Sequence, residues 1–145
     1  MAVTRMDHVG VVVEDLEAAT AFFVALGMEV EGSGPVEGQW VDTVVGLDGV
    51  RVDVAMVRVP GGHGKLELTR FHHPLATGSE PDAPANRLGL RRLMFAVDDI
   101  DEVVAGLRAR GFDLVGDIAQ FEDVYRLCYV RGPEGIIVAL AEELG

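Results

Sequence analysis

An internal repeat restricts the possible folds of this chain more than any other feature of its sequence. When the sequence is shifted by 84 residues, residues 8–15 align with residues 92–99, and the register holds without a gap as far as Gly32 and Gly116. Several aligned positions carry identical residues, among them Val13 and Val97, Asp15 and Asp99, Gly27 and Gly111, and Gly32 and Gly116. Agreement in both apolar pattern and turn residues indicates two copies of one structural unit.

Each copy begins with the pattern of a strand followed by an amphipathic helix. Met6–Val13 is rich in valine, which is typical of a strand, and Asp15 stands where a helix N-cap belongs. Gly27 is placed to end that helix, and Asp99 and Gly111 repeat the two signals, with Glu102 as a capping-box partner. The apolar residues between them recur at helical spacing: Leu16, Ala19, Phe23 and Leu26, then Ile100, Val103, Val104 and Leu107.

Three further strands are expected after each helix, separated by glycine- and proline-rich turns. They are about Met28–Gly32, Val50–Val59 and Lys65–Phe71 in the first copy, and Phe112–Gly116, Val124–Arg131 and Ile136–Ala141 in the second. The segment 36–47 is longer than a hairpin turn, so we expect a short helix and a pocket rim there. The sequence therefore predicts one α+β domain over residues 1–145, with module 1 at 5–71, a linker at 72–89 and module 2 at 90–143.

Composition limits the classes of partner. The formal net charge of −12 disfavours nucleic-acid and anionic-membrane partners, because it repels phosphate groups. No apolar run approaches the roughly 20 residues that cross a bilayer. Cys128 is the single cysteine and lies in an apolar strand pattern, so we expect a buried, unreactive thiol and a cytoplasmic location.

Four stretches of the sequence resemble the vicinal oxygen chelate superfamily, over nearly the whole chain. The stretches are Met6–Asp15, Lys65–Thr69, Met94–Ile100 and Tyr129–Val138. This superfamily includes glyoxalase I, bleomycin-resistance proteins, extradiol dioxygenases, methylmalonyl-CoA epimerase and fosfomycin-resistance proteins. The resemblance implies two βαβββ modules in tandem, forming a cupped mixed sheet with outer helices, and a homodimer. Pairing of modules within one chain and pairing by domain swapping both stay open.

The resemblance also implies a divalent metal, such as zinc, nickel, manganese or iron, between the modules. The matching ligand positions are His8, Glu67, Arg92 and Ala139. Strand alternation independently places His8 on one face with Gly10, away from the neighbouring valines. Arginine offers only donors and alanine offers no ligand, so His8 and Glu67 form an incomplete site. We therefore expect no metal, with a metal bound by His8 and Glu67 as the alternative.

Two functions fit a cup with an incomplete metal site. The first is binding of a small organic molecule, with Arg92, Trp40, Tyr125 and Tyr129 as ligand-binding residues. The second is a lyase, isomerase or dioxygenase, with or without metal, that uses His8 and Glu67 as catalytic groups. Glyoxalase I chemistry itself is disfavoured, because Ala139 replaces a metal-bound carboxylate.

Other histidines and the tryptophan have ordinary structural interpretations. Adjacent strand residues point to opposite faces, so His72-His73 is interpreted as a linker turn and not as a metal pair. His63 is expected at a hairpin tip. Trp40 fits core packing and a pocket lid equally well.

Overall fold

The computed structural model describes residues 2–145, which form two compact units, residues 2–78 and residues 79–145. The division falls inside the predicted linker. No helix within residues 2–145 has both the length and the apolar character that a membrane crossing requires.

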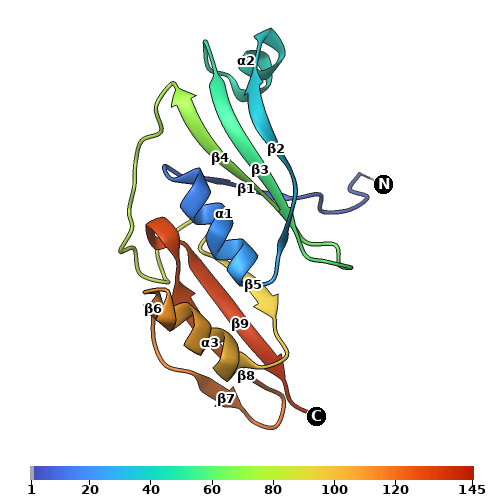
Figure 1. Ribbon diagram of the computed structural model, residues 1–145, viewed down its shortest axis with the longest axis vertical. Helices are drawn as coiled ribbons and strands as arrows, with labels where there is room; N and C mark the ends of the chain where they lie inside the picture. Colours follow the sequence, from blue (N-terminus) through green and yellow to red (C-terminus); the bar gives the residue numbers. More distant parts are fainter. Residues whose placement is uncertain (1) are drawn as a thin grey trace. The chain divides into compact units, whose positions relative to one another are not determined.

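The first unit is a four-stranded sheet with a helix on one face (Figure 1). Its strands are β1 (Val9–Val12), β2 (Glu29–Glu37), β3 (Arg51–Arg58) and β4 (Lys65–His73), in the order β1-β4-β3-β2. β1 runs parallel to β4, and the other neighbours are antiparallel. The helices are α1 (Leu16–Ala25) and α2 (Gln39–Val45).

Helix α1 begins and ends where the sequence predicts. The Asp15 carboxylate accepts a hydrogen bond of 2.9 Å from the backbone N–H of Ala18, and Gly27 adopts a φ of 110°, which favours glycine. Phe23 of α1 and Leu68 of β4 are both fully buried. The apolar side of α1 therefore covers the sheet face that carries Leu68, and the opposite face is left without α1.

Helix α2 occupies the segment in which a short helix was expected. The Asp42 carboxylate accepts hydrogen bonds from the N–H groups of Gly49 and Val50, at 3.0 and 2.8 Å, and so ties α2 to the turn before β3. Val41 packs with Val50 and Val52 in a small buried cluster. β2 is longer than predicted and reaches Glu37, because its pairing with β3 continues to Glu37 after an irregularity between Val30 and Gly32.

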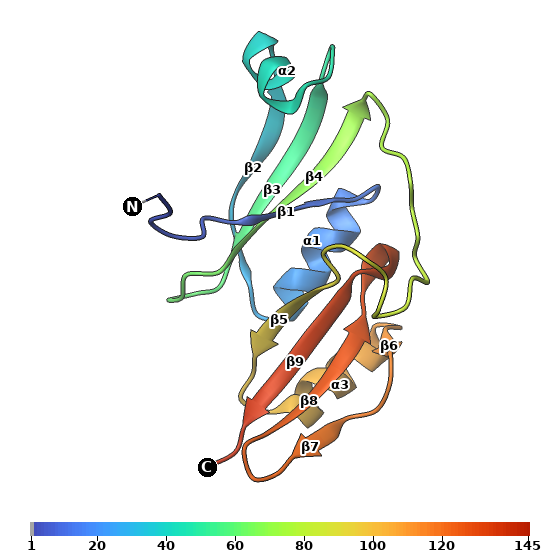
Figure 2. The ribbon, with the colours of Figure 1, turned by 180° about the vertical axis from the view of Figure 1, so that it is seen from behind.

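The second unit repeats this plan (Figure 2). Its sheet has the order β5-β9-β8-β6, with a short β7 paired to β8, and β5 is parallel to β9. The elements are β5 (Arg92–Ala96), α3 (Ile100–Ala109), β6 (Asp113–Leu114), β7 (Ala119–Phe121), β8 (Tyr125–Arg131), the single 3₁₀ turn η1 (Pro133–Gly135) and β9 (Ile137–Glu143).

Helix α3 covers one face of this sheet, as α1 does in the first unit (Figures 1 and 2). The Asp99 carboxylate accepts a hydrogen bond of 3.2 Å from the N–H of Glu102, and Gly111 has a φ of 93°. Ile100 and Leu140 are fully buried, and Cys128 is buried as expected. The predicted fold class, two βαβββ units in tandem, is confirmed.

Further local predictions also differ from the structure. The strand expected at Phe112–Gly116 contains only Asp113–Leu114, and β7 was not foreseen. The histidines expected in a linker turn instead end β4. His72 bonds the Asp53 carboxylate at 2.7 Å and His73 bonds the carbonyl oxygen of Gly49 at 2.9 Å, so side-chain contacts to β3 and its preceding turn hold both residues in the strand.

Candidate functional site

The sheet face opposite α1 in the first unit is hollowed into a cavity of about 430 Å³. Strand register explains which residues share this face. Gly10 of β1 lies beside Glu67 of β4, and Val12 lies beside Thr69, which in turn faces Val54 of β3. The lining is otherwise formed mainly by valines and aromatic residues: Val11, Val36, Trp40, Val41, Val44, Val45, Val50, Val52 and Phe71.

Two features keep the hollow open. Gly10 has no side chain, and a Cβ atom built on it would meet nothing within 4 Å, so the space next to Glu67 is unfilled. Helix α2 forms a rim at the end of the sheet, where its exposed side chains border the hollow. Trp40 is 64% exposed and Val44 is 76% exposed. Apolar side chains gathered at an open concave surface mark a binding site more often than a structural core.

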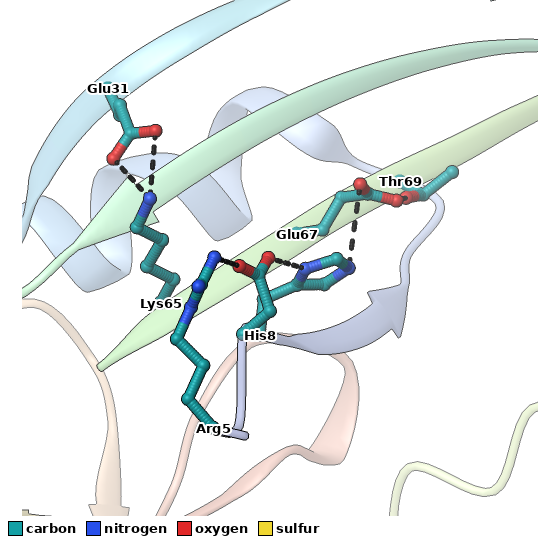
Figure 3. Close-up of polar contacts among 7 residues, drawn as sticks. Arg5, His8, Glu31, Lys65, Glu67 and Thr69 are labelled. Atoms are coloured by element: carbon teal, nitrogen blue, oxygen red, sulfur yellow. Dashed lines mark hydrogen bonds and ion pairs between the residues drawn. The ribbon is translucent and has the colours of Figure 1, made fainter. Parts of the chain in front are cut away.

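Glu67 is the one charged side chain among the described residues that line the hollow. Its Oε1 accepts a long hydrogen bond of 3.4 Å from the Thr69 hydroxyl, and its Oε2 lies 3.7 Å from Nε2 of His8 (Figure 3). The Glu67 side chain is about a third exposed, at 35%. The predicted proximity of His8 and Glu67 is therefore present within this unit.

His8 is held from its other side by Asp7. Nδ1 of His8 lies 2.8 Å from Oδ2 of Asp7, whose Oδ1 accepts a hydrogen bond of 2.9 Å from Arg5. The hydrogen bond with His8 and then that with Arg5 lower the pKa of the Asp7 carboxyl. His8 precedes β1 and is not part of it. Its ring orientation thus depends on Asp7 and Glu67 and not on the strand ladder.

The cations beside this face already have carboxylate partners. Nζ of Lys65 lies 3.0 Å from a Glu31 oxygen on β2, and Arg58 lies 2.8 Å from Glu29 (Figure 3 shows the Lys65 pair). The Arg58–Glu29 pair joins the neighbouring strands β3 and β2, and the Lys65–Glu31 pair reaches from β4 across β3 to β2. They leave the Glu67 carboxylate without a lysine or arginine partner among the described contacts.

The remaining predicted site residues belong to the second unit. The Arg92 guanidinium carbon lies 5.3 Å from the centroid of the Tyr129 ring, a cation–π arrangement. Tyr129 is paired with Ala139 of β9, which is buried, and Tyr125 contacts Phe121 with ring centroids 5.7 Å apart. The sequence predicts that four residues converge on one cavity: His8, Glu67, Arg92 and Ala139. Because these residues belong to both units, their convergence stays a prediction.

Sequence reasoning missed most of the lining of the hollow. It named Glu67 and Trp40, but not Thr69, Phe71 or the valines of β3. The alternation Glu67, Thr69, Phe71 along β4 carried the signal, because residues two apart share a face of a strand. The apolar side chains of α2 were a second signal that the short helix would line the same space.

The family model of the glyoxalase/bleomycin resistance protein/dioxygenase superfamily matches residues 7–129. The chain belongs to this superfamily. No functionally curated protein matches the sequence.

Solved structures of glyoxalase-like proteins share the fold of this superfamily member. A glyoxalase family protein from Bacillus cereus is 48% identical over 100% of this chain and 99% of its own, with a TM-score of 0.96. TnmS3, described as an antibiotic binding protein from Streptomyces sp. CB03234, is 22% identical over 99% of this chain and 98% of its own, with a TM-score of 0.66. A glyoxylase/bleomycin resistance protein/dioxygenase domain from Frankia sp. EAN1pec is 16% identical over 98% of this chain and 99% of its own, with a TM-score of 0.70.

The residues of this glyoxalase-like chain do not fit the metal that the resemblance implies. Within residues 2–145, no three His, Cys, Asp or Glu side chains gather closely enough to hold an ion. His8 and Glu67 supply two ligands, whereas catalytic zinc and non-haem iron sites use three protein ligands. The buried methyl group of Ala139 and the guanidinium of Arg92 add none.

Proposed function

We propose that the protein binds a small, largely apolar organic molecule in the hollow of its first unit. The observation that carries this proposal is a cavity of about 430 Å³ with an apolar lining and one carboxylate. Sites for drug-sized ligands have volumes of roughly 300–1,000 Å³, and a few polar groups in an apolar lining fix the ligand's orientation. The hollow has both properties.

Exposed apolar surface supplies the driving force. Val12, Trp40 and Val44 are more than half exposed, at 55%, 64% and 76%. Removing such surface from water contributes roughly 25 cal/mol for each Å² that a ligand covers. A ligand that covered Trp40 and its neighbours would therefore gain affinity without any metal.

The fold is compatible with this role. One protein with the same fold, TnmS3, is described as an antibiotic binding protein, although its 22% identity is evidence for the fold alone. Proteins of one fold carry many functions, so the proposal rests on the hollow itself.

Thermal-shift measurements with a panel of aromatic and drug-like compounds test this function. A ligand at 100 times its Kd stabilises a protein by about 2.7 kcal/mol, which shifts the melting temperature by several degrees in a chain of this size. Saturable stabilisation, with Trp40 fluorescence changing over the same concentration range, is the expected result. Absence of stabilisation across the panel would contradict the proposal.

Catalysis is the second candidate, and the His8–Glu67 pair favours it. The two side chains lie 3.7 Å apart beside the hollow, and both can exchange protons. A lyase or isomerase would use one of them as a general base. Turnover that disappears in both His8→Ala and Glu67→Ala is expected for such an enzyme, whereas turnover retained in both variants would exclude these residues from the chemistry.

We further propose that the protein works without a resident metal and as a homodimer. Elemental analysis of the purified chain checks the first statement, and ordered zinc, nickel, manganese or iron bound by His8 and Glu67 would contradict it. Sedimentation equilibrium checks the second.

A further inference from the structure

We propose that the ligand of this hollow is an organic cation, an elongated apolar molecule with an amine at one end, whose ammonium group pairs with Glu67. This inference rests on the proposed function and adds the chemical class of the ligand. It follows from the contacts of Glu67, the charges around it and its place along β4.

Glu67 has unused capacity to accept hydrogen bonds. An ionised carboxylate has about four acceptor positions. The contacts described for Glu67 are one hydrogen bond of 3.4 Å from Thr69 and one approach of 3.7 Å to His8, both longer than a strong charge-assisted bond. An ammonium group can donate three short hydrogen bonds. It would lie in the space left by the absent side chain of Gly10.

The charges around the hollow favour a cation over an anion. Among the described residues that line it there is no lysine, arginine or histidine. Lys65, two residues before Glu67 on the same strand, is paired with Glu31 at 3.0 Å. A carboxylate at the edge of an apolar surface attracts a ligand cation more strongly than a fully hydrated carboxylate does, because the local dielectric is lower. The net charge of −12 adds long-range attraction for cations.

The hollow also sets the shape of the ligand. Glu67, Thr69 and Phe71 follow one another on one face of β4, and Phe71 packs against the cluster of Val41, which belongs to α2. Strand residues rise about 3.3 Å each, so Glu67 and Phe71 are separated by roughly 13 Å. An amine at Glu67 would therefore leave the apolar body to extend along β4 towards α2, where Trp40 offers an aromatic face.

A matched set of three ligands tests this inference: naphthylmethylamine, naphthylmethanol and naphthylacetate. They share the aromatic body and differ in carrying a positive, neutral or negative group. Isothermal titration calorimetry on the full chain should show the amine binding about 10-fold more tightly than the alcohol and the acetate binding most weakly. In Glu67→Gln the amine and the alcohol should bind equally tightly, so that the ratio of their Kd values falls to about 1. Glu37→Gln removes the same charge from β2, at a residue that does not line the hollow, and should keep the preference.

Salt dependence provides a test that needs no variant. Glu67 is partly exposed, so the affinity for the amine should fall as sodium chloride is raised, while the affinity for the alcohol should not fall. This measurement tests the preference for a cation even if Glu67→Gln does not fold.

The outcomes separate this inference from the proposed function. Equal affinities for the amine and the alcohol would overturn the cation preference and leave small-molecule binding intact. Binding of none of the three compounds to a folded, monodisperse protein would contradict both. Amine binding that dissociates a second copy of the chain, detected by sedimentation, would assign the hollow to self-association and would also overturn the inference.

Discussion

Gly10 of β1 lies directly beside Glu67 of β4 in the parallel ladder of the first unit. A side chain at position 10 would point into the hollow next to the carboxylate, and an ideal Cβ there meets no atom within 4 Å. The pairing of a glycine with the one charged lining residue thus creates the space that the proposed ligand needs.

The variant Gly10→Val should fill this space without damaging the fold. Valine suits a strand better than glycine does, so the free energy of unfolding should stay the same or rise by up to about 1 kcal/mol. Ligand-induced stabilisation should disappear, because the new side chain occupies the site. Urea unfolding with and without naphthylmethylamine measures both quantities. Undiminished ligand stabilisation in Gly10→Val would place the binding site elsewhere.

Trp40 should report occupancy of the hollow. It is the only tryptophan in the chain and is 64% exposed, so its fluorescence belongs to one known position on α2. A ligand that covers the indole should reduce its quenching by acrylamide about two-fold or more and shift its emission to shorter wavelength. Quenching that does not change at a ligand concentration shown by calorimetry to be saturating would contradict the placement of the ligand beside α2.

The two N-caps should contribute equally to stability. Asp15 and Asp99 each accept a hydrogen bond from the backbone N–H three residues further on, at 2.9 and 3.2 Å. Replacing either with alanine should lower the free energy of unfolding by about 1 kcal/mol, and Asp→Asn, which keeps the cap, should cost far less. Chemical denaturation checks these values. A loss in the asparagine variants equal to that in the alanine variants would show that charge, and not capping, is responsible.

These caps illustrate what the sequence could predict. Asp15, Gly27, Asp99 and Gly111 act locally, through neighbouring backbone groups, so their roles were visible in the sequence and the structure confirms them. The internal repeat of the sequence also predicted the two tandem units. Strand ends were less predictable, because the end of β4 depends on contacts of His72 and His73 with β3 and the turn before it.

The candidate site was only partly predictable for the same reason. Glu67 was identified by its resemblance to a ligand position and by strand alternation, and its approach to His8 was expected. The hollow itself depends on the register of β1, β3 and β4 and on α2 folding over the sheet end. Such features arise from pairing between distant segments, which one sequence does not specify residue by residue. For this reason, Thr69 and Phe71 were not identified from the sequence as residues that line the hollow.

Cys128 gives a prediction for alkaline pH. Burial raises the pKa of its thiol above the ordinary value of a cysteine, and the nearby charges of Arg108 and Arg126 offset this only in part. The folded state therefore holds the thiol proton more tightly than the unfolded state does. Its contribution to stability is complete below the unfolded pKa and is lost as the pH rises through the folded pKa. Native alkylation by iodoacetamide should be far slower than in urea, and its rate should rise at a higher pH. Equal pH profiles in the two states would contradict this burial effect.

Gly135 and Gly106 should respond in opposite directions to alanine. Gly135 has a φ of 85°, and a Cβ built there would overlap the backbone of Pro81. The conformation alone costs alanine about 1–2 kcal/mol, and the overlap adds to that cost, so Gly135→Ala should clearly destabilise the protein.

Gly106 lies within α3, is exposed and has open space around it. Gly106→Ala should therefore raise the free energy of unfolding by about 0.5–1 kcal/mol. Thermal and urea unfolding of the two variants, beside the parent chain, measure the contrast. A stable Gly135→Ala protein would mean that residues near Pro81 do not pack against the turn before β9.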